Sequence, residues 1–249
     1  MKYDKVTAAY FSPTGNSKKV ANCIAETIGK EIENIDITVM ASDAEFTGED
    51  FVILSAPVYA GRIPNVARER FSRFKGNNTP SIIVATYGNR EFDDALLEMA
   101  DMLREQGFVI KGAAGVIGRH TYGEIQMERP DENDLAECRE FGAKAAASEK
   151  VWPEFEIPGN RPYREGAGKG KFHPITAENC VKCGLCVRNC PVNAIAEDCM
   201  SVGDECISCF RCIRSCPLTA KHMDTEAYNK FAAEFTEKLK VRKENTFFL

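Results

Sequence analysis

Eight cysteines between residues 180 and 216 constrain this chain more than any other feature of its sequence. They form two runs with the spacing C-x₂-C-x₂-C-x₃-C-P, and every position of the second run lies 26 residues after its counterpart in the first. Thiolates at this spacing are typical ligands of a [4Fe–4S] cluster, in which each of the four irons takes one external ligand. The cysteines are Cys180, Cys183, Cys186 and Cys190 in the first run, and Cys206, Cys209, Cys212 and Cys216 in the second.

The last cysteine of each run is expected to bind the cluster of the other run. Three cysteines on one tight loop reach three irons, and the fourth ligand must approach from another direction. Cys216 therefore completes the cluster of the first run, and Cys190 completes the cluster of the second. A structural zinc site, which usually takes two C-x₂-C pairs, and disulfides, which need an oxidising compartment, fit the triplets less well. Cys199, between the runs, is a spare thiol or an alternative ligand.

The overall composition is that of an ordinary globular protein. Hydrophobic residues make up 44% of the 249 residues, charged residues 28%, and the net charge is −5 without a basic run, so we expect no nucleic-acid partner. The N-terminal segment MKYDKVTAAYF lacks the apolar core of a signal peptide. No apolar run approaches the ~20 residues that a membrane span needs. These patterns predict a cytoplasmic protein with no membrane span.

Residues 1–150 alternate strand and helix signals, which predicts an α/β fold with a parallel sheet. We expect strands at 6–11, 32–39, 51–56, 81–86 and 108–117, and helices at 16–29, 65–74, 92–106 and 131–147. Residues 151–171 are rich in proline and glycine and read as a linker. The GAGKG within it lacks the preceding strand and following helix of a phosphate loop. Residues 226–249 form a tail with an amphipathic helix at 226–242, which docks on the protein's own body or binds a partner.

Three loops follow predicted strands at their carboxyl ends, where ligands bind in open α/β sheets. The loop at residues 12–17 offers hydroxyls and N–H groups at a helix N-terminus, which suit a phosphate or merely cap the helix. The other two each place a tyrosine beside a glycine, which suits a planar ring or an ordinary turn. The candidate residues are Ser12, Thr14, Gly15, Asn16 and Ser17; Pro57, Tyr59, Ala60, Gly61 and Arg62; and Thr86, Tyr87, Gly88 and Asn89.

Two family resemblances follow from these motifs. Residues 172–225, including the pieces CPVNAI and CPLTA, resemble the bacterial two-cluster ferredoxins. The three loops are similar to those of the flavodoxin family over about residues 3–148. That resemblance implies a doubly wound five-stranded parallel sheet in the order 2-1-3-4-5, with FMN bound by its phosphate to the first loop and by its ring to the other two. The runs PVYAGRIP and TYGNREFDDALLEM look like the EFR1-family ferredoxins, which fuse a flavodoxin-like domain to a two-cluster ferredoxin module.

One departure from the flavodoxin pattern concerns charge. Flavodoxins often surround the flavin with acidic residues, whereas here Arg62 and Arg90 lie in the ring loops. A cation near the ring would stabilise an anionic flavin.

The domain order predicts an electron-transfer protein. Residues 1–150 would bind FMN, residues 172–225 would hold two [4Fe–4S] clusters, and the chain would relay single electrons between them. A redox partner protein or a small oxidant or reductant completes the exchange. The alternatives are an FMN-dependent reductase acting on NAD(P)H, a quinone or another small oxidant, and a non-redox module stabilised by metal. GAAGVIG at residues 112–118 lies on a late strand and is a poor dinucleotide fingerprint. The linker allows the ferredoxin module to fold over its own sheet or to reach a second chain in a homodimer. No residue stands out as catalytic.

Overall fold

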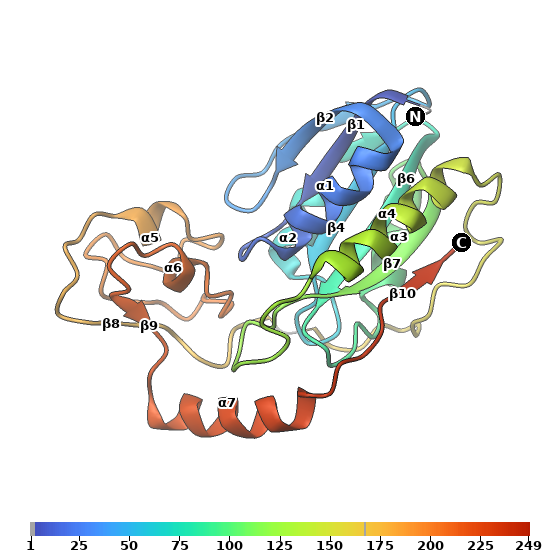
Figure 1. Ribbon diagram of the computed structural model, residues 1–249. Coiled ribbons are helices and arrows are strands. Elements are labelled where there is room, and N and C mark those ends of the chain that lie inside the picture. Colours follow the sequence, from blue (N-terminus) through green and yellow to red (C-terminus); the bar gives the residue numbers. More distant parts are fainter. Residues whose placement is uncertain (1–2, 167) are drawn as a thin grey trace.

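The structure is a computed structural model that describes residues 3–166 and 168–249. Met1 and Lys2, which begin the N-terminal segment considered for a signal peptide, and Ala167 of GAGKG lie outside the described residues. A larger α/β body carries the sheet, a smaller body carries α5 (Leu185–Arg188) and α6 (Arg211–Arg214), and the helix α7 (Glu226–Leu239) runs beneath both (Figure 1). None of the helices within the described ranges is long and apolar enough to cross a membrane.

Five parallel strands form the body of the sheet in the order β2-β1-β4-β6-β7. Their bounds are β1 (Tyr3–Tyr10), β2 (Gly29–Asp36), β4 (Val52–Pro57), β6 (Thr79–Tyr87) and β7 (Phe108–Ile117). In chain order this is 2-1-3-4-5, the order expected for these five strands. The second strand begins three residues earlier than predicted, because Gly29 leaves α1 directly in an extended conformation.

The prediction of a five-stranded sheet is wrong in one respect. The short strand β10 (Thr246–Phe248) pairs antiparallel with β7 and makes a sixth strand, with Phe247 opposite Ala114. A three-residue strand has too little alternation to be recognised in a sequence. Two further strands, β3 (Ala44–Phe46) and β5 (Phe74–Gly76), form a separate parallel pair. Because β5 begins at Phe74, the helix predicted at 65–74 ends earlier, at Phe71.

Helices cover both faces of the sheet (Figure 1). One layer holds α1 (Asn16–Ile28) and α4 (Glu132–Ala147), and the other holds α2 (Asn65–Phe71) and α3 (Ala95–Glu105). Alternate residues of the central strands enter the two cores, which explains why these strands read as continuous apolar runs. Cys23 and Cys138 pack in the core beneath α1 and α4.

The linker is irregular but well packed. Phe155 and Ile157 lie in the same core as α3, and the side chain of Asp94 accepts hydrogen bonds from the backbone N–H groups of Asn160 and Arg164. The ferredoxin module follows, with the strands β8 (Ile175–Thr176) and β9 (Lys221–His222) paired antiparallel, and the short helices α5 (Leu185–Arg188) and α6 (Arg211–Arg214).

The tail helix α7 (Glu226–Leu239) docks on the protein's own body. Thr225 caps it by accepting a hydrogen bond from the Tyr228 N–H. On its inner side, Tyr228 and Phe231 contact the ring of Tyr122, whose segment follows β7.

Candidate functional site

A cavity of about 310 Å³ lies at the carboxyl ends of β1, β4 and β6, between the α/β body, the linker, the ferredoxin module and α7. The structure brings eleven of the fourteen candidate flavin residues to this one cavity. They are Ser12, Thr14, Asn16, Ser17, Pro57, Tyr59, Ala60, Gly61, Thr86, Tyr87 and Gly88. The other three, Gly15, Arg62 and Asn89, do not line it.

The first loop ends at a helix N-terminus that is only partly capped. Gly15 is the N-cap of α1 in the left-handed region (φ 96°) and has no side chain that could cap the helix. Helix N–H groups without partners favour an anion, since they carry the positive end of the helix dipole. The hydroxyl of Ser12 already accepts from the Lys18 N–H, and that of Ser17 pairs with Thr86 at 2.7 Å. Thr14 lines the cavity, and its hydroxyl has no hydrogen-bond partner among the described residues.

Asn16 has a positioning role at this end. Its side-chain N–H donates to the Arg119 carbonyl at 3.0 Å, and a Cβ on Gly118 would lie 2.5 Å from that nitrogen. The first loop is therefore fixed to the segment after β7.

The second loop makes a tight turn in which the backbones of Tyr59 and Arg62 exchange two hydrogen bonds. The Arg62 side chain turns away from the cavity to Glu98, which it binds through Nε at 2.7 Å and through Nη2 at 2.5 Å. This pair is buried, with side-chain exposures of 13% and 4%. Arg62 does not line the cavity, because the buried carboxylate of Glu98 holds its guanidinium, and its role at the flavin ring stays a prediction.

The third loop is tied to the tail. Asn89, with a φ of 65°, donates its side-chain N–H groups to the carbonyls of Leu239 and Val241 at 2.8 and 2.6 Å. Arg90 does line the cavity, but it is ion-paired with Asp93. Neither arginine of the ring loops is thus a free cation.

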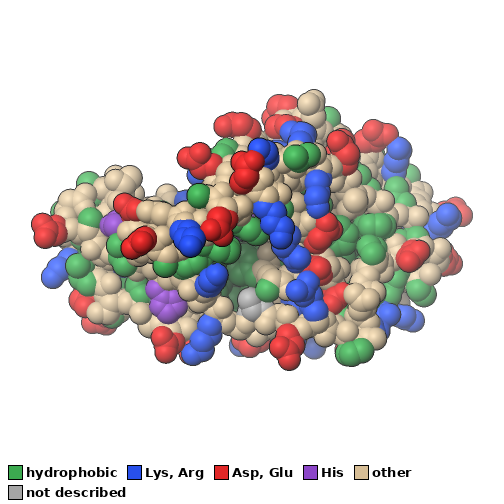
Figure 2. All heavy atoms as spheres, turned by 90° about the horizontal axis from the view of Figure 1, so that it is seen from below, with side chains coloured by type: hydrophobic (Ala, Val, Ile, Leu, Met, Phe, Trp, Pro, Cys, Tyr) green, Lys and Arg blue, Asp and Glu red, His purple; other side chains and the backbone are tan. Residues whose placement is uncertain are grey.

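Several lining residues were not predicted from the sequence. The segment after β7 contributes Arg119, Thr121 and Tyr122, the linker contributes Lys169, Gly170 and Lys171, and α7 contributes Phe231 and Phe235. Seen from below, a hollow with a hydrophobic floor has Lys and Arg side chains around it (Figure 2). The ammonium of Lys171 lies 4.4 Å from the ring centre of Phe231. Only the position of residues 119–122 after a strand end offered a sequence signal.

His120 also lines the cavity, as its place after the fifth predicted strand allowed. Its ring packs against the third loop so closely that a Cβ on Gly88 would lie 2.0 Å from it. Burial lowers the pKa of His120 to about 4, so the ring is neutral, and its Nδ1 lies 2.8 Å from the Tyr122 nitrogen and 3.1 Å from the Tyr122 carbonyl oxygen.

A second, smaller cavity lies inside the ferredoxin module. Its lining contains the four cysteines that the sequence assigned to one cluster: Cys190, Cys206, Cys209 and Cys212. Of the other set, Cys186 is buried in α5 and Cys183 is exposed. No three His, Cys, Asp or Glu side chains among the described residues converge as a single metal ion requires. A cubane needs no such convergence, because each cysteine binds a different iron.

The 26-residue repeat extends to the backbone. Three pairs of equivalent residues share the left-handed conformation: φ is 53° and 50° at Lys182 and Ser208, 74° and 60° at Gly184 and Phe210, and 51° and 50° at Asn193 and Thr219. A non-glycine residue in this region costs about 1–2 kcal/mol. Phe210 offsets this by packing its ring against Tyr122 and Tyr228.

The two cavities share a wall. Ile207 and Ser208 line both the flavin-side cavity and the cavity of the second cysteine run. Gly170 backs this wall by donating its N–H to the Cys206 carbonyl at 2.7 Å, and a Cβ on Gly170 would lie 2.0 Å from the Ser208 hydroxyl. Tyr59, in the second flavin loop, lies near enough to Cys206 and Cys209 to interact electrostatically with both.

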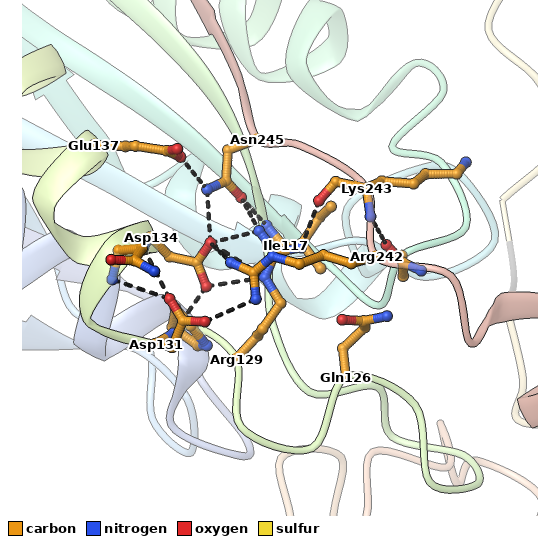
Figure 3. Close-up of polar contacts among 12 residues, drawn as sticks. Ile117, Gln126, Arg129, Asp131, Asp134, Glu137, Arg242, Lys243 and Asn245 are labelled. Atoms are coloured by element: carbon orange, nitrogen blue, oxygen red, sulfur yellow. Dashed lines mark hydrogen bonds and ion pairs between the residues drawn. The ribbon is translucent and has the colours of Figure 1, made fainter.

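The tail that follows α7 is anchored by a buried network (Figure 3). The guanidinium of Arg129 binds Asp134 at the start of α4, and it also donates to the Lys243 carbonyl at 2.7 Å and to the Asn245 side chain at 3.1 Å. Asn245 in turn donates to Asp134 at 2.9 Å, and Arg242 pairs with Asp131 at 2.7 Å. The network fixes both α7 and β10 to the α/β body.

Comparisons with known families match both parts of the chain. A flavodoxin domain model matches residues 8–109, and two 4Fe–4S binding domain models match residues 173–196 and 203–228. These matches show a flavodoxin-like domain followed by two 4Fe–4S domains, and with them FMN and two [4Fe–4S] clusters as cofactors. Membership of the named fused family stays a prediction.

Similar solved structures cover a little more than half of the chain. Oxidised flavodoxin 1 from Bacillus cereus is 20% identical over 57% of this chain and 97% of its own, with a TM-score of 0.44. A flavodoxin from the domain Archaea is 16% identical over 57% and 96%, with a TM-score of 0.41. An oxidoreductase from Corynebacterium diphtheriae is 15% identical over 59% and 94%, also with a TM-score of 0.41. A search of curated proteins found no match.

Proposed function

We propose that this chain, an iron–sulfur flavoprotein of electron transfer that joins a flavodoxin domain to two 4Fe–4S domains, passes single electrons across the wall of Ile207 and Ser208. The observation that carries the proposal is that these two residues line both cofactor cavities. The two cofactors would thus be separated by a wall of only two residues. This short and fixed distance within one chain would make a diffusional encounter unnecessary.

The residues present fit FMN. The N-terminus of α1, which Ser12 caps only at the Lys18 N–H, and the hydroxyl of Thr14 would hold its phosphate, and the loops with Tyr59 and Gly88 would flank its ring. When bound, FMN stores two electrons that it exchanges singly, and each cluster exchanges one. The neutral ring of His120 lies at the same cavity.

The arrangement also suggests an order. Cys190, Cys206, Cys209 and Cys212 would hold the cluster next to the flavin, and Cys180, Cys183, Cys186 and Cys216 the outer one. Cys183 is exposed, so an external redox protein or small molecule would exchange electrons at the outer cluster. Both cavities of the relay lie within one chain, so the relay does not require a homodimer. The cytoplasmic location stays a prediction.

The reductase alternative gains no specific support. Residues 112–117 of the glycine-rich stretch lie within β7, where no phosphate-binding turn is formed. Bleaching of the flavin by NADH or NADPH under anaerobic conditions would nevertheless bring this alternative back.

The relay is tested by two matched variants. Cys190→Ala should remove the cluster next to the flavin and spare the outer one, and Cys216→Ala should do the reverse. Each protein is mixed anaerobically with a substoichiometric low-potential donor, and the flavin bands and cluster EPR signals are followed. The wild-type protein should show electron transfer to FMN at a rate independent of protein concentration, which Cys190→Ala should lose and Cys216→Ala should keep. Clusters that stay reduced beside oxidised FMN, or a rate that scales with protein concentration, would overturn the proposal.

A further inference from the structure

Lys221 is the one described residue that places a buried ammonium inside the ferredoxin module. It lies in β9 opposite Thr176 of β8 and is only 2% exposed. Its Nζ has no hydrogen-bond partner among the described residues. A buried charge without a counter-charge is strongly unfavourable, so a lysine at this position requires an anion beside it.

The repeat shows how unusual this residue is. Lys221 lies 26 positions after Ile195, and the alanines that precede the two, Ala194 and Ala220, are both buried. Ile195 lines the cavity of Cys190 and the second run. Since the two halves of the module share their backbone conformation, Lys221 holds the equivalent place at the site that Cys216 completes. One half of the repeat therefore has an aliphatic side chain where the other half has a cation.

The surroundings of Lys221 are cysteines. Its charge acts on the thiols of Cys186 and Cys216 in the first-run set, and also on those of Cys206 and Cys212 in the second-run set. Its own backbone N–H is one of three, with those of Leu218 and Ala220, that point to the Cys216 sulfur. No carboxylate among the described residues pairs with it, so the anion it can meet is a thiolate-ligated cluster.

We propose that Lys221 is the internal counter-ion of the clusters and raises their reduction potentials, most of all that of the outer cluster. A [4Fe–4S] cluster with four thiolates is anionic, and reduction adds one further negative charge. A fixed cation in a low-dielectric interior stabilises the reduced form more than the oxidised form. The asymmetry would make the outer cluster the better electron acceptor of the two. The inference rests on the proposed function only in taking these cysteines as cluster ligands.

The test replaces the charge with the residue that the repeat already uses. Lys221→Ile copies Ile195, and Lys221→Met keeps the length of the side chain. Lys182→Met is the control, since Lys182 lies between two first-run cysteines but is exposed. Midpoint potentials of both clusters are measured by redox titration with EPR in the complete protein. The Cys190→Ala variant, which should keep only the outer cluster, identifies its signal.

Both Lys221 variants should bind the same iron as the wild-type protein. The midpoint potential of the outer cluster should fall by at least about 59 mV. For a one-electron couple this is a tenfold change in the equilibrium constant of reduction. The control should change it by clearly less. Unchanged potentials, an equal shift in the control, or loss of iron from both Lys221 variants would overturn the proposal, the last because it would make Lys221 a structural requirement. Equilibrium potentials do not depend on transfer to FMN, so a failed relay leaves this test intact.

Discussion

The buried network that anchors the tail offers a quantitative test. Arg129 and Asp134 have side-chain exposures of 2% and 1%, and the Arg129 guanidinium donates five hydrogen bonds, to Asp134, Lys243 and Asn245. Arg129→Met would leave the Asp134 carboxylate buried without its main partner. Removing one partner of a buried ion pair typically costs 3–5 kcal/mol. We expect about 3 kcal/mol, because Arg242 and Asn245 still contact the carboxylate.

The matched control lies on α4, the helix that carries Asp134. Lys144 pairs with Glu140 one turn away, and their side chains are 61% and 68% exposed. Lys144→Met should therefore cost no more than about 0.5 kcal/mol. Urea unfolding followed by far-UV circular dichroism and flavin fluorescence measures both variants.

A second measurement separates loss of the tail from general destabilisation. Amide hydrogen exchange in β10 should accelerate far more in Arg129→Met than exchange in the central strand β4, because the Lys243 carbonyl and Asn245 lose their donor. A cost within about 0.5 kcal/mol of the control, or equal exchange in the two strands, would refute the reasoning that this network holds the tail.

Three shorter predictions follow from the same structure. Gly15→Val should weaken FMN binding about tenfold, since a φ of 96° costs a branched residue about 1–2 kcal/mol. The control is Gly168→Val, which also enters open space but has no positive φ, and it should leave the affinity for FMN in a titration unchanged. Anaerobically purified protein should contain about eight irons and eight sulfides per chain, and about four would leave one cysteine set without a cluster. The hydrogen bond from Arg242 lowers the pKa of Asp131 to about 2, below the ordinary value of about 3.9. The contribution of ionised Asp131 to the free energy of unfolding is present above pH ~4 and lost as the pH falls towards 2. Asp131→Asn should therefore flatten the plot of the free energy of unfolding against pH in this range, and an unaltered slope would contradict the assignment.

The five parallel strands and the common edge of the three candidate loops could be predicted from local patterns, whereas the strand order came from the resemblance to flavodoxins. Continuous apolar runs mark strands buried on two faces, and in an open α/β sheet their carboxyl ends lie at one edge. The meeting of Cys190 with three cysteines of the second run around one cavity was predictable for a similar reason, since the spacing of the run itself requires a fourth ligand from the other half.

The direction of individual side chains could not be predicted. Arg62 lies in the expected loop but turns to Glu98, which is 36 positions away and whose burial is decided by the packing of α3. Asn89 was expected at the flavin ring, yet it binds the carbonyls of residues 239 and 241. The wall of Ile207 and Ser208 depends on how two bodies meet, which no local pattern encodes.

The pairing of β10 with β7 has a consequence for taking the protein apart. The ferredoxin module and α7 are inserted between two segments of a single sheet, so the α/β body is discontinuous in sequence. A fragment cut at the linker would leave the edge of β7 without its covering strand, and an uncovered edge invites pairing between copies and aggregation. An independent flavin-binding unit would have to be a permuted chain, in which residues 246–248 are rejoined to the body by a new short connection.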